Sequence, residues 1–160
     1  MNKPIKRNPH LAALSRDHHQ GLLFCWKLRM GIRYEVNPER MLAYVRYFWP
    51  LHFKPHFAEE EEFIFFPHPS EMTKRAIEEH ETMRQQIGQI EAGATYDTFN
   101  KIADLADKHI RFEERELFPY LEETLTEAQL LAIGQAVEAA PVCGADEFAD
   151  EFWTKPKTNA

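Results

Sequence analysis

The sequence predicts an all-α protein: an up-down-up-down four-helix bundle over about residues 9–125, then a short fifth C-terminal helix and a tail within residues 126–160. Apolar residues recur at steps of three and four along four successive segments, which is the spacing of one face of an α-helix. Prolines, a glycine and helix-capping residues stand between these segments. With 160 residues, 44% hydrophobic and 28% charged, the chain matches one globular domain over residues 1–160.

The first predicted helix begins at Asn8-Pro9, an N-cap followed by proline at the first helical position, and continues to about Arg33. The second opens at Asn37-Pro38 in the same way. Because Pro50 and Pro55 each remove a backbone donor and clash with the preceding turn, we expect a kink or a short non-helical step there. The inward positions are Leu11, Leu14, His18, Leu22, Cys25 and Leu28 in the first helix, and Val45, Phe48 or Trp49, His52, His56, Glu60 and Phe63 or Ile64 in the second.

The third predicted helix follows the turn marked by Pro67, Pro69 and Ser70 and ends at Gly93. The fifth begins at Thr126, with Gln129 at the capping-box spacing, and ends near Ala139. The inward positions are Ala76, Ile77, His80, Met83, Arg84, Ile87 and Ile90 in the third helix, and Phe99, Ile102, Ala106, His109, Glu113, Glu116 or Leu117, and Tyr120 in the fourth.

Charge and composition exclude several classes of function. A formal net charge of −7 argues against a nucleic-acid partner, because phosphate binding needs clustered lysine and arginine. No apolar run is long enough to span a membrane, and none follows the basic residues of segment 1–10 to form a signal peptide. Cys25 and Cys143 lie far apart, which disfavours a disulfide framework or a thiolate zinc site. These features predict a cytoplasmic protein.

Two histidine–glutamate pairs form an internal similarity. His56-x-x-x-Glu60 precedes a Phe-Pro pair, and so does His109-x-x-x-Glu113. Residues four apart project from the same side of a helix, so both members of a pair can reach one point in the core. A single pair is more often a solvated face, and a single core histidine is more often satisfied by a backbone hydrogen bond.

The coincidence of four histidines and two carboxylates on four inward stripes favours a metal site. His18 and His80 lie on the other two stripes, and burying carboxylates without compensation is costly. Imidazole and carboxylate without thiolate suit iron, manganese or zinc, and six ligands exceed the four of a structural zinc site. A two-metal centre fits better. If Glu60 and Glu113 bridge the ions together with one oxo or hydroxo group, each ion keeps an open position for a small molecule.

The motifs Asp17-His18, His56-Phe57-x-x-Glu60, Glu79-His80 and His109-x-x-x-Glu113 resemble the hemerythrin-like, or HHE cation-binding, family over about residues 9–125. The resemblance implies a bundle that holds an oxo-bridged pair of iron ions on His18, His56, Glu60, His80, His109 and Glu113. It also implies a small diatomic partner such as dioxygen or nitric oxide.

The sequence departs from the oxygen-carrying members of that family at Arg84, where those members have a further histidine. Arg84 could pair with a bridging glutamate, stabilise a bound anion such as peroxide, or form a plain salt bridge. Three residues compete with the predicted ligands: Glu114 with Glu113, Glu61 with Glu60, and His19 with His18. Helical spacing favours Glu113, Glu60 and His18 as the ligands.

Several functions fit such a site. We expect a binding protein that stores, senses or scavenges a diatomic molecule, because no separate acid, base or nucleophile indicates a substrate. The alternatives are a di-iron redox enzyme or an iron-handling or repair protein, and a metal-free helical scaffold. The tail from Pro141 onward, with Phe148, Phe152 and Trp153, could fold back on the bundle or join two chains in a homodimer.

Overall fold

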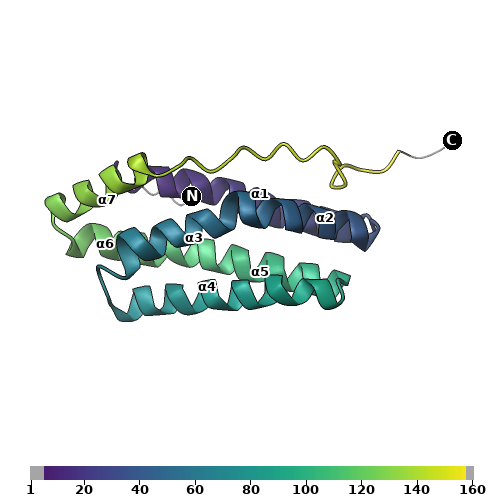
Figure 1. The fold of residues 1–160 in the computed structure, drawn as a ribbon, viewed down its shortest axis with the longest axis horizontal. Coiled ribbons are helices and arrows are strands. Elements are labelled where there is room, and N and C mark those ends of the chain that lie inside the picture. The colour runs from purple at the N-terminus through teal and green to yellow at the C-terminus, as the bar shows by residue number, and fades with distance from the viewer. Residues whose placement is uncertain (1–5, 158–160) are drawn as a thin grey trace.

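A computed structural model describes residues 6–157. The predicted single domain therefore extends beyond the described residues at both ends, and half of segment 1–10 lies outside them. The described part of the chain consists of helices and their connections and contains no strand, which confirms the all-α prediction (Figure 1).

The first long helix is α1, Ala12–Arg33. It starts three residues after the predicted position at Pro9, because Asn8 caps a separate turn. In that turn the Asn8 side chain accepts a hydrogen bond from the His10 amide at 2.9 Å, and its carbonyl accepts one from the Leu11 amide at 3.0 Å. The end of the helix at Arg33 matches the prediction.

The second rod consists of α2 (Pro38–Phe48), the π-helical turn η1 (Trp49–Phe53), α3 (Lys54–Glu60) and the π-helical turn η2 (Glu61–Phe65). As predicted, Asn37 caps its start. Of the two expected outcomes at Pro50 and Pro55, a kink or a short non-helical step, the non-helical step is wrong, since the chain stays helical. In η1 the Lys54 amide bonds to the Trp49 carbonyl five residues back, and this wider turn accommodates the proline rings.

The third rod is α4 (Glu71–Gln89) with the 3₁₀ turn η3 (Ile90–Ala92). The fourth consists of α5 (Tyr96–Phe112), the π-helical turn η4 (Glu113–Leu117) and α6 (Phe118–Thr124). The last helix is α7 (Glu127–Ala139), in which Thr126 and Gln129 form the predicted capping box. These four helical segments are called rods, and α1 is the first rod. No described helix has the length and apolar character needed to cross a bilayer.

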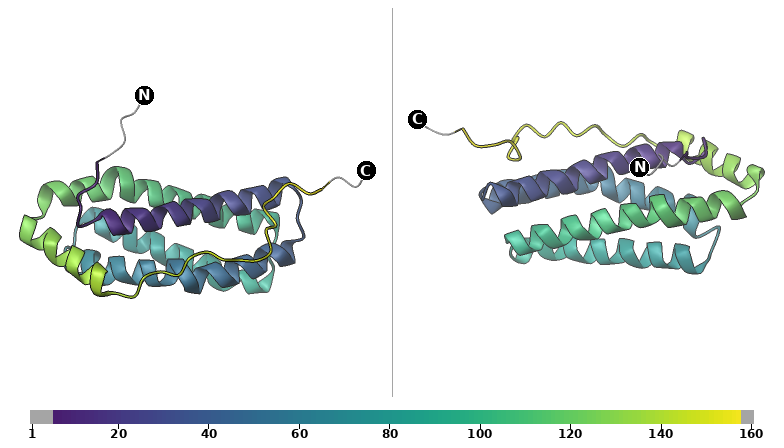
Figure 2. Two further views of the ribbon diagram at one scale, coloured as in Figure 1. Left: turned by 90° about the horizontal axis from the view of Figure 1, so that it is seen from above. Right: turned by 180° about the vertical axis from the view of Figure 1, so that it is seen from behind.

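The four rods lie side by side along the long axis of the molecule (Figures 1 and 2). α1 packs on α5, α5 on α4, and α4 on η2, while α7 covers η2 at one end. The core consists of two apolar clusters, one around Phe24, Phe48 and Ile102 and the other around Leu14, Phe65 and Leu117. On each rod, the predicted ligands lie in the sequence at the boundary between these clusters.

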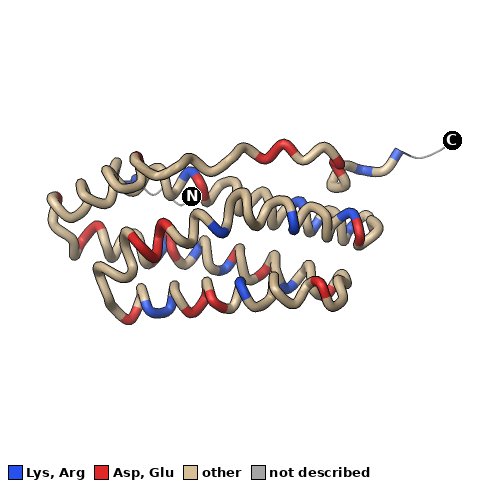
Figure 3. Tube along the Cα trace, viewed as in Figure 1, with Lys and Arg blue, Asp and Glu red and all other residues tan. Residues whose placement is uncertain are grey.

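The described part of the tail folds back along α1 and α2 (Figure 2). Its Asp146 carboxylate accepts hydrogen bonds from Tyr44 Oη at 2.6 Å and from Lys27 Nζ at 2.9 Å. Phe152 is fully buried. Figure 3 shows acidic residues along the tail above basic residues of the helices, and Asp150 pairs with Arg40. The tail is therefore part of the fold.

Candidate metal centre

Six polar side chains meet between the four rods, and each is at most 3% exposed. They are His18 from α1, His56 and Glu60 from α3, His80 from α4, His109 from α5 and Glu113 at the start of η4. These are the six ligands that the sequence predicts. The structure brings all of them together, and their role as ligands stays a prediction.

The six residues form two groups of four that share both carboxylates. One group contains His18 and His56, the other His80 and His109, and both contain Glu60 and Glu113. Within each group, one possible ligand atom per residue lies within 4.8 Å of the others. Glu113 turns one oxygen to each group: Oε2 lies 2.8 Å from His18 Nε2, and Oε1 lies 2.6 Å from His109 Nε2.

Most of the atoms that face this centre make no hydrogen bond of good geometry, even where a Glu113 oxygen lies within 2.8 Å of an imidazole nitrogen. All four oxygens of Glu60 and Glu113 are buried without such a bond, and so are Nε2 of His18 and Nε2 of His56. Nε2 of His80 and Nε2 of His109 lie 3.0 Å from each other. Buried polar atoms are rarely left unpaired in native proteins. Cations between them would satisfy all of these atoms, so the residues fit a metal centre of nitrogen and oxygen donors.

The opposite ring nitrogen of each histidine, Nδ1, lies against an outer carboxylate. The partners are Asp17 for His56 at 3.4 Å, Glu61 for His80 at 3.3 Å, Glu79 for His109 at 2.9 Å and Glu114 for His18 at 2.6 Å. An ionised carboxylate only accepts hydrogen bonds, so Nδ1 carries the hydrogen. In a neutral ring Nε2 then presents its lone pair to the centre, as a metal ligand must.

These four bonds form a closed ring around the molecule. Each outer carboxylate lies on one rod and holds the histidine of the next, and Glu114 on the fourth rod returns to His18 on the first. Arginines hold three of the four carboxylates: Arg7 on Glu114, Arg75 on Glu79 and Arg84 on Glu61. Among the described residues, no arginine or lysine pairs with the fourth, Asp17. It lines a cavity of about 290 Å³.

The outer ring of carboxylates is not among the features predicted from the sequence. A signal was present, because each outer carboxylate is the immediate neighbour of a predicted ligand in the sequence. Asp17 precedes His18 and Glu79 precedes His80, while Glu61 and Glu114 follow the two central glutamates. A helical neighbour points about 100° away, toward the adjacent rod. The sequence does not indicate which rod faces each of these carboxylates.

The structure also places the residues that competed with the predicted ligands. Glu61 and Glu114 face Nδ1 atoms and lie outside both groups of four, and His19 is exposed. Arg84 pairs with Glu61, and not with a central glutamate. His52 donates from Nε2 to the Asp17 carbonyl at 3.0 Å, so it supports the residue that holds His56.

Burial and mutual attraction shift the pKa values of these groups in the metal-free protein. Burial alone would lower the pKa of His56, but the adjacent Glu60 carboxylate and Asp17 raise it to about 9. Burial and repulsion from Glu113 would raise the pKa of Glu60, but His56 and His18 together lower it. Without a cation the centre therefore holds protons on its histidines, and a metal ion has to displace them.

Aromatic side chains enclose the centre. The Phe57 ring stacks on His80 with 3.8 Å between ring centroids, and the Phe118 ring stacks on His18 at 5.4 Å. The π-helical turn η2 follows Glu60 directly, and η4 begins at Glu113. Such turns are frequent at functional sites. The centre is thus buried under apolar rings and has irregular helix on two sides.

A buried centre of histidines and carboxylates between helical rods defines the chain as a helical protein with a cation site. Residues 10–121 match the family model of the hemerythrin HHE cation binding domain, so the chain belongs to the hemerythrin family. No curated protein and no solved structure matches the chain.

Proposed function

We propose that the protein holds a pair of non-haem iron ions and binds dioxygen or a related diatomic molecule, such as nitric oxide, for storage, sensing or scavenging. The observation that carries this proposal is that both groups of four share Glu60 and Glu113. A carboxylate that turns one oxygen to each of two histidine pairs is suited to bridge two ions. We also propose that the four rods run in the up-down-up-down order.

The donors divide evenly between the two ions. His18 and His56 would hold one ion, His80 and His109 the other, and Glu60 and Glu113 would bridge them together with an oxo or hydroxo group. Each ion would then have two nitrogens, two carboxylate oxygens and the bridge, so a six-coordinate ion keeps one open position. When bound, such ions supply that position and the electrons for a diatomic ligand. Zinc or manganese could replace iron on these donors.

The surrounding side chains suit reversible binding of a neutral ligand. Every predicted ligand is buried, and Phe57 and Phe118 lie directly on two of the histidines. This shell limits the access of water and protons, which would promote loss of an activated ligand. The outer ring of carboxylates fixes the orientation of the histidines.

Metal content and reversible ligand binding test the proposal. The chain should be expressed in iron-supplemented medium, purified without a histidine tag and assayed by elemental mass spectrometry. The expected result is two irons per chain. After anaerobic reduction, dioxygen or nitric oxide should produce an optical change that reverses when the gas is removed.

Other outcomes would support the alternatives. Steady turnover of peroxide or nitric oxide, in place of reversible binding, would favour a di-iron redox enzyme. Transfer of iron to an acceptor protein would favour an iron-handling or repair role. A chain that takes up no iron, zinc or manganese under any loading condition would be a helical scaffold, and the proposal would fail.

A further inference from the structure

The proposed ligand needs a route through the protein. None of the six predicted ligands is more than 3% exposed, and Glu60, His80 and Glu113 are completely buried. A molecule from solution can therefore reach the centre only if side chains move. The question is which part of the wall separates the centre from a space that a small neutral molecule would occupy.

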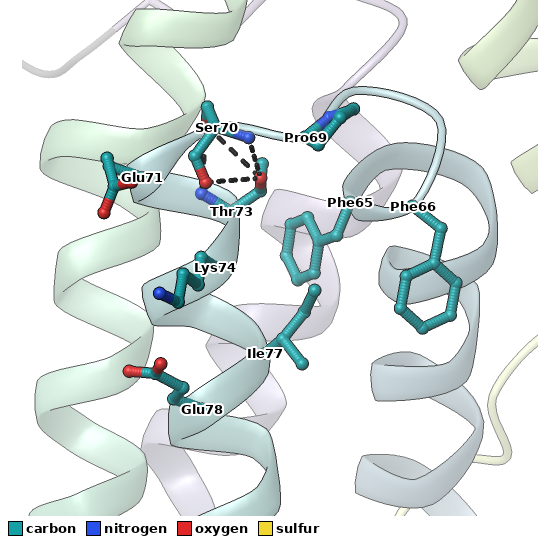
Figure 4. A pocket seen from close by; sticks show the side chains of 9 residues that line it. All are labelled: Phe65, Phe66, Pro69, Ser70, Glu71, Thr73, Lys74, Ile77 and Glu78. Atoms are coloured by element: carbon teal, nitrogen blue, oxygen red, sulfur yellow. Dashed lines mark hydrogen bonds between the residues drawn. The ribbon is translucent and has the colours of Figure 1, made fainter.

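A cavity of about 900 Å³, which is open to solvent, lies between the end of the second rod and the start of α4 (Figure 4). Phe65, Phe66, Pro69 and Ile77 give it an apolar wall. Figure 4 shows the Phe65 and Ile77 side chains pointing toward each other across the space between η2 and α4. The hydroxyl groups on its wall are already paired, because Ser70 and Thr73 form the capping box of α4.

Phe65 connects this cavity to the centre. Its ring lies 5.5 Å from the His80 ring, centroid to centroid, and is itself only 1% exposed. The Phe57 ring stacks on His80, with 3.8 Å between the ring centroids. Phe65 thus lines the cavity and lies next to a predicted ligand.

This cavity also has Glu71, Lys74 and Glu78 on its wall, but charged residues make up a larger share of the walls of the other cavities near the centre. The one beside Asp17 is also lined by Arg16, Glu59 and Glu138. A third, of about 440 Å³ on α5 and η4, has three arginines and a lysine on its wall. Charged walls hold ordered water and attract ions, whereas a neutral diatomic molecule partitions into apolar surroundings.

We propose that the cavity between η2 and α4 collects the neutral diatomic ligand and that rotation of the Phe65 ring admits it to the His80 side of the centre. This inference rests on the proposed function. Phe65 acts on the height of the barrier and not on the bound state. Its variants should therefore change the association and dissociation rates by the same factor and leave the equilibrium dissociation constant unchanged.

Stopped-flow kinetics of nitric oxide binding to the iron-loaded protein test this proposal. Phe65→Leu shortens the separating side chain and should raise both rates severalfold. Ile77→Trp fills the cavity from α4 and should lower both rates. Ile77 is only partly buried, so this second variant keeps the test decisive if Phe65→Leu does not fold. The matched controls are Phe63→Leu on η2 and Ile87→Trp on α4, neither of which lines the cavity.

A second measurement does not need iron. In the zinc-loaded protein under dioxygen pressure, dissolved dioxygen should enhance the paramagnetic relaxation of the Ile77 methyl carbons well above that of Ile102 in the other cluster. Equal enhancement would overturn the inference, as would nitric oxide rates that neither variant changes. If iron-loaded protein binds no diatomic ligand but Ile77 still shows the enhancement, the proposed function fails and the apolar collecting site stands.

Discussion

At the residue scale, the two ring nitrogens of each predicted histidine ligand have different roles. Nδ1 of each predicted ligand lies against an outer carboxylate, and this contact fixes the ring so that Nε2 faces the centre. The four oxygens of the two central glutamates make no hydrogen bond of good geometry, and a cation between them would satisfy them. The centre is therefore specified by individual side chains, and single substitutions should separate their roles.

Glu113→Ala should remove more metal than His56→Ala. Glu113 belongs to both groups of four, so its loss would weaken the binding of both proposed ions, whereas His56 belongs to one group. Elemental mass spectrometry after dialysis against a chelator should find almost no metal in Glu113→Ala and at most half of the wild-type content in His56→Ala. His10→Ala, which lies outside both groups, is the control and should keep full metal. Full metal in all three variants would contradict the ligand assignment.

His52 should make the metal-free protein sensitive to acid. Burial lowers the pKa of His52 from an ordinary value near 6.5 to about 4. Between these values the unfolded chain binds a proton that the folded chain does not, so the free energy of unfolding falls as the pH falls from 6.5 toward 4. The loss amounts to roughly 3 kcal/mol when complete.

Urea denaturation of the metal-free protein at several pH values between 6.5 and 4.5 measures this effect. Carboxyl groups whose pKa values the fold lowers, such as Glu61 and Glu114, add a loss of stability in the same direction near the acid end of this window, so the contribution of His52 has to be isolated with a variant. His52→Gln cannot titrate and should show a flatter dependence on pH. The same slope in both proteins would rule out His52 as its origin.

At the element scale, the distance between neighbouring helices decides whether the rods can share one centre. Gly21 lies one turn after His18 on α1, and a Cβ atom there would come within 2.6 Å of Ile110 Cδ1 on α5. Ile110 follows the predicted ligand His109. The missing side chain thus permits the approach of two rods that both contribute histidines. The outer carboxylates then tie each rod to the next.

Gly21→Leu should destabilise the protein by roughly 1–3 kcal/mol, because overpacking forces the α1 and α5 side chains apart. Gly88→Leu is the matched control. Gly88 lies on α4, where an added Cβ would meet no side chain and no backbone of another element within 4 Å, so leucine should stabilise the helix there by up to about 1 kcal/mol. Chemical denaturation measures both values. A neutral Gly21→Leu would show that the rods can separate at little cost.

Arg84→Met should loosen one metal ion. Methionine keeps an unbranched apolar side chain but releases Glu61, which then holds His80 less firmly. Loss of such supporting contacts typically weakens metal binding 10–100-fold. The rate of metal transfer to a chelator should rise for one of two kinetic phases. Arg46→Met, which breaks an exposed pair with Glu91, should leave both phases unchanged. If neither phase changes in Arg84→Met, the ion pair between Arg84 and Glu61 does not support the metal site.

At the scale of the whole molecule, a charged centre divides the apolar core into two clusters, and each cluster has its own cover. α7 contributes Leu130 and Ile133 to one, and the tail contributes Phe152 to the other. Since metal binds only the folded chain with useful affinity, it should stabilise the molecule in proportion to the logarithm of its concentration. α7 and the tail contribute to the free energy of unfolding independently of the metal.

Removing the tail after Pro141 should lower the melting temperature without emptying the metal centre. Truncation exposes Tyr44 and leaves Lys27 without Asp146, and a chain with a newly exposed aromatic surface should self-associate. Calorimetry, light scattering and metal analysis measure the three effects. Loss of metal on truncation would show instead that the tail supports the centre directly.

The helices and most of the inward residues could be predicted from the sequence alone, although Leu22, Ile77 and Arg84 are only half-buried. Period and capping residues are local, so Asn37, Thr126 and Gln129 could be assigned to helix ends from their neighbours alone. The four-residue spacing of His56 and Glu60 likewise fixed which side of the helix they share. Prolines were harder, because a proline marks a disturbed turn but not the π-helical form that accommodates it in η1.

The contacts that each residue makes with another rod could be assigned only from the three-dimensional structure. It placed Glu61 and Glu114 on Nδ1 atoms, joined Arg84 to Glu61, and folded the tail onto α1 and α2. These contacts depend on the order, rotation and separation of the rods, which result from packing over the whole core. A sequence records which side of a helix a side chain occupies, but the partner across the gap exists only once the rods have packed.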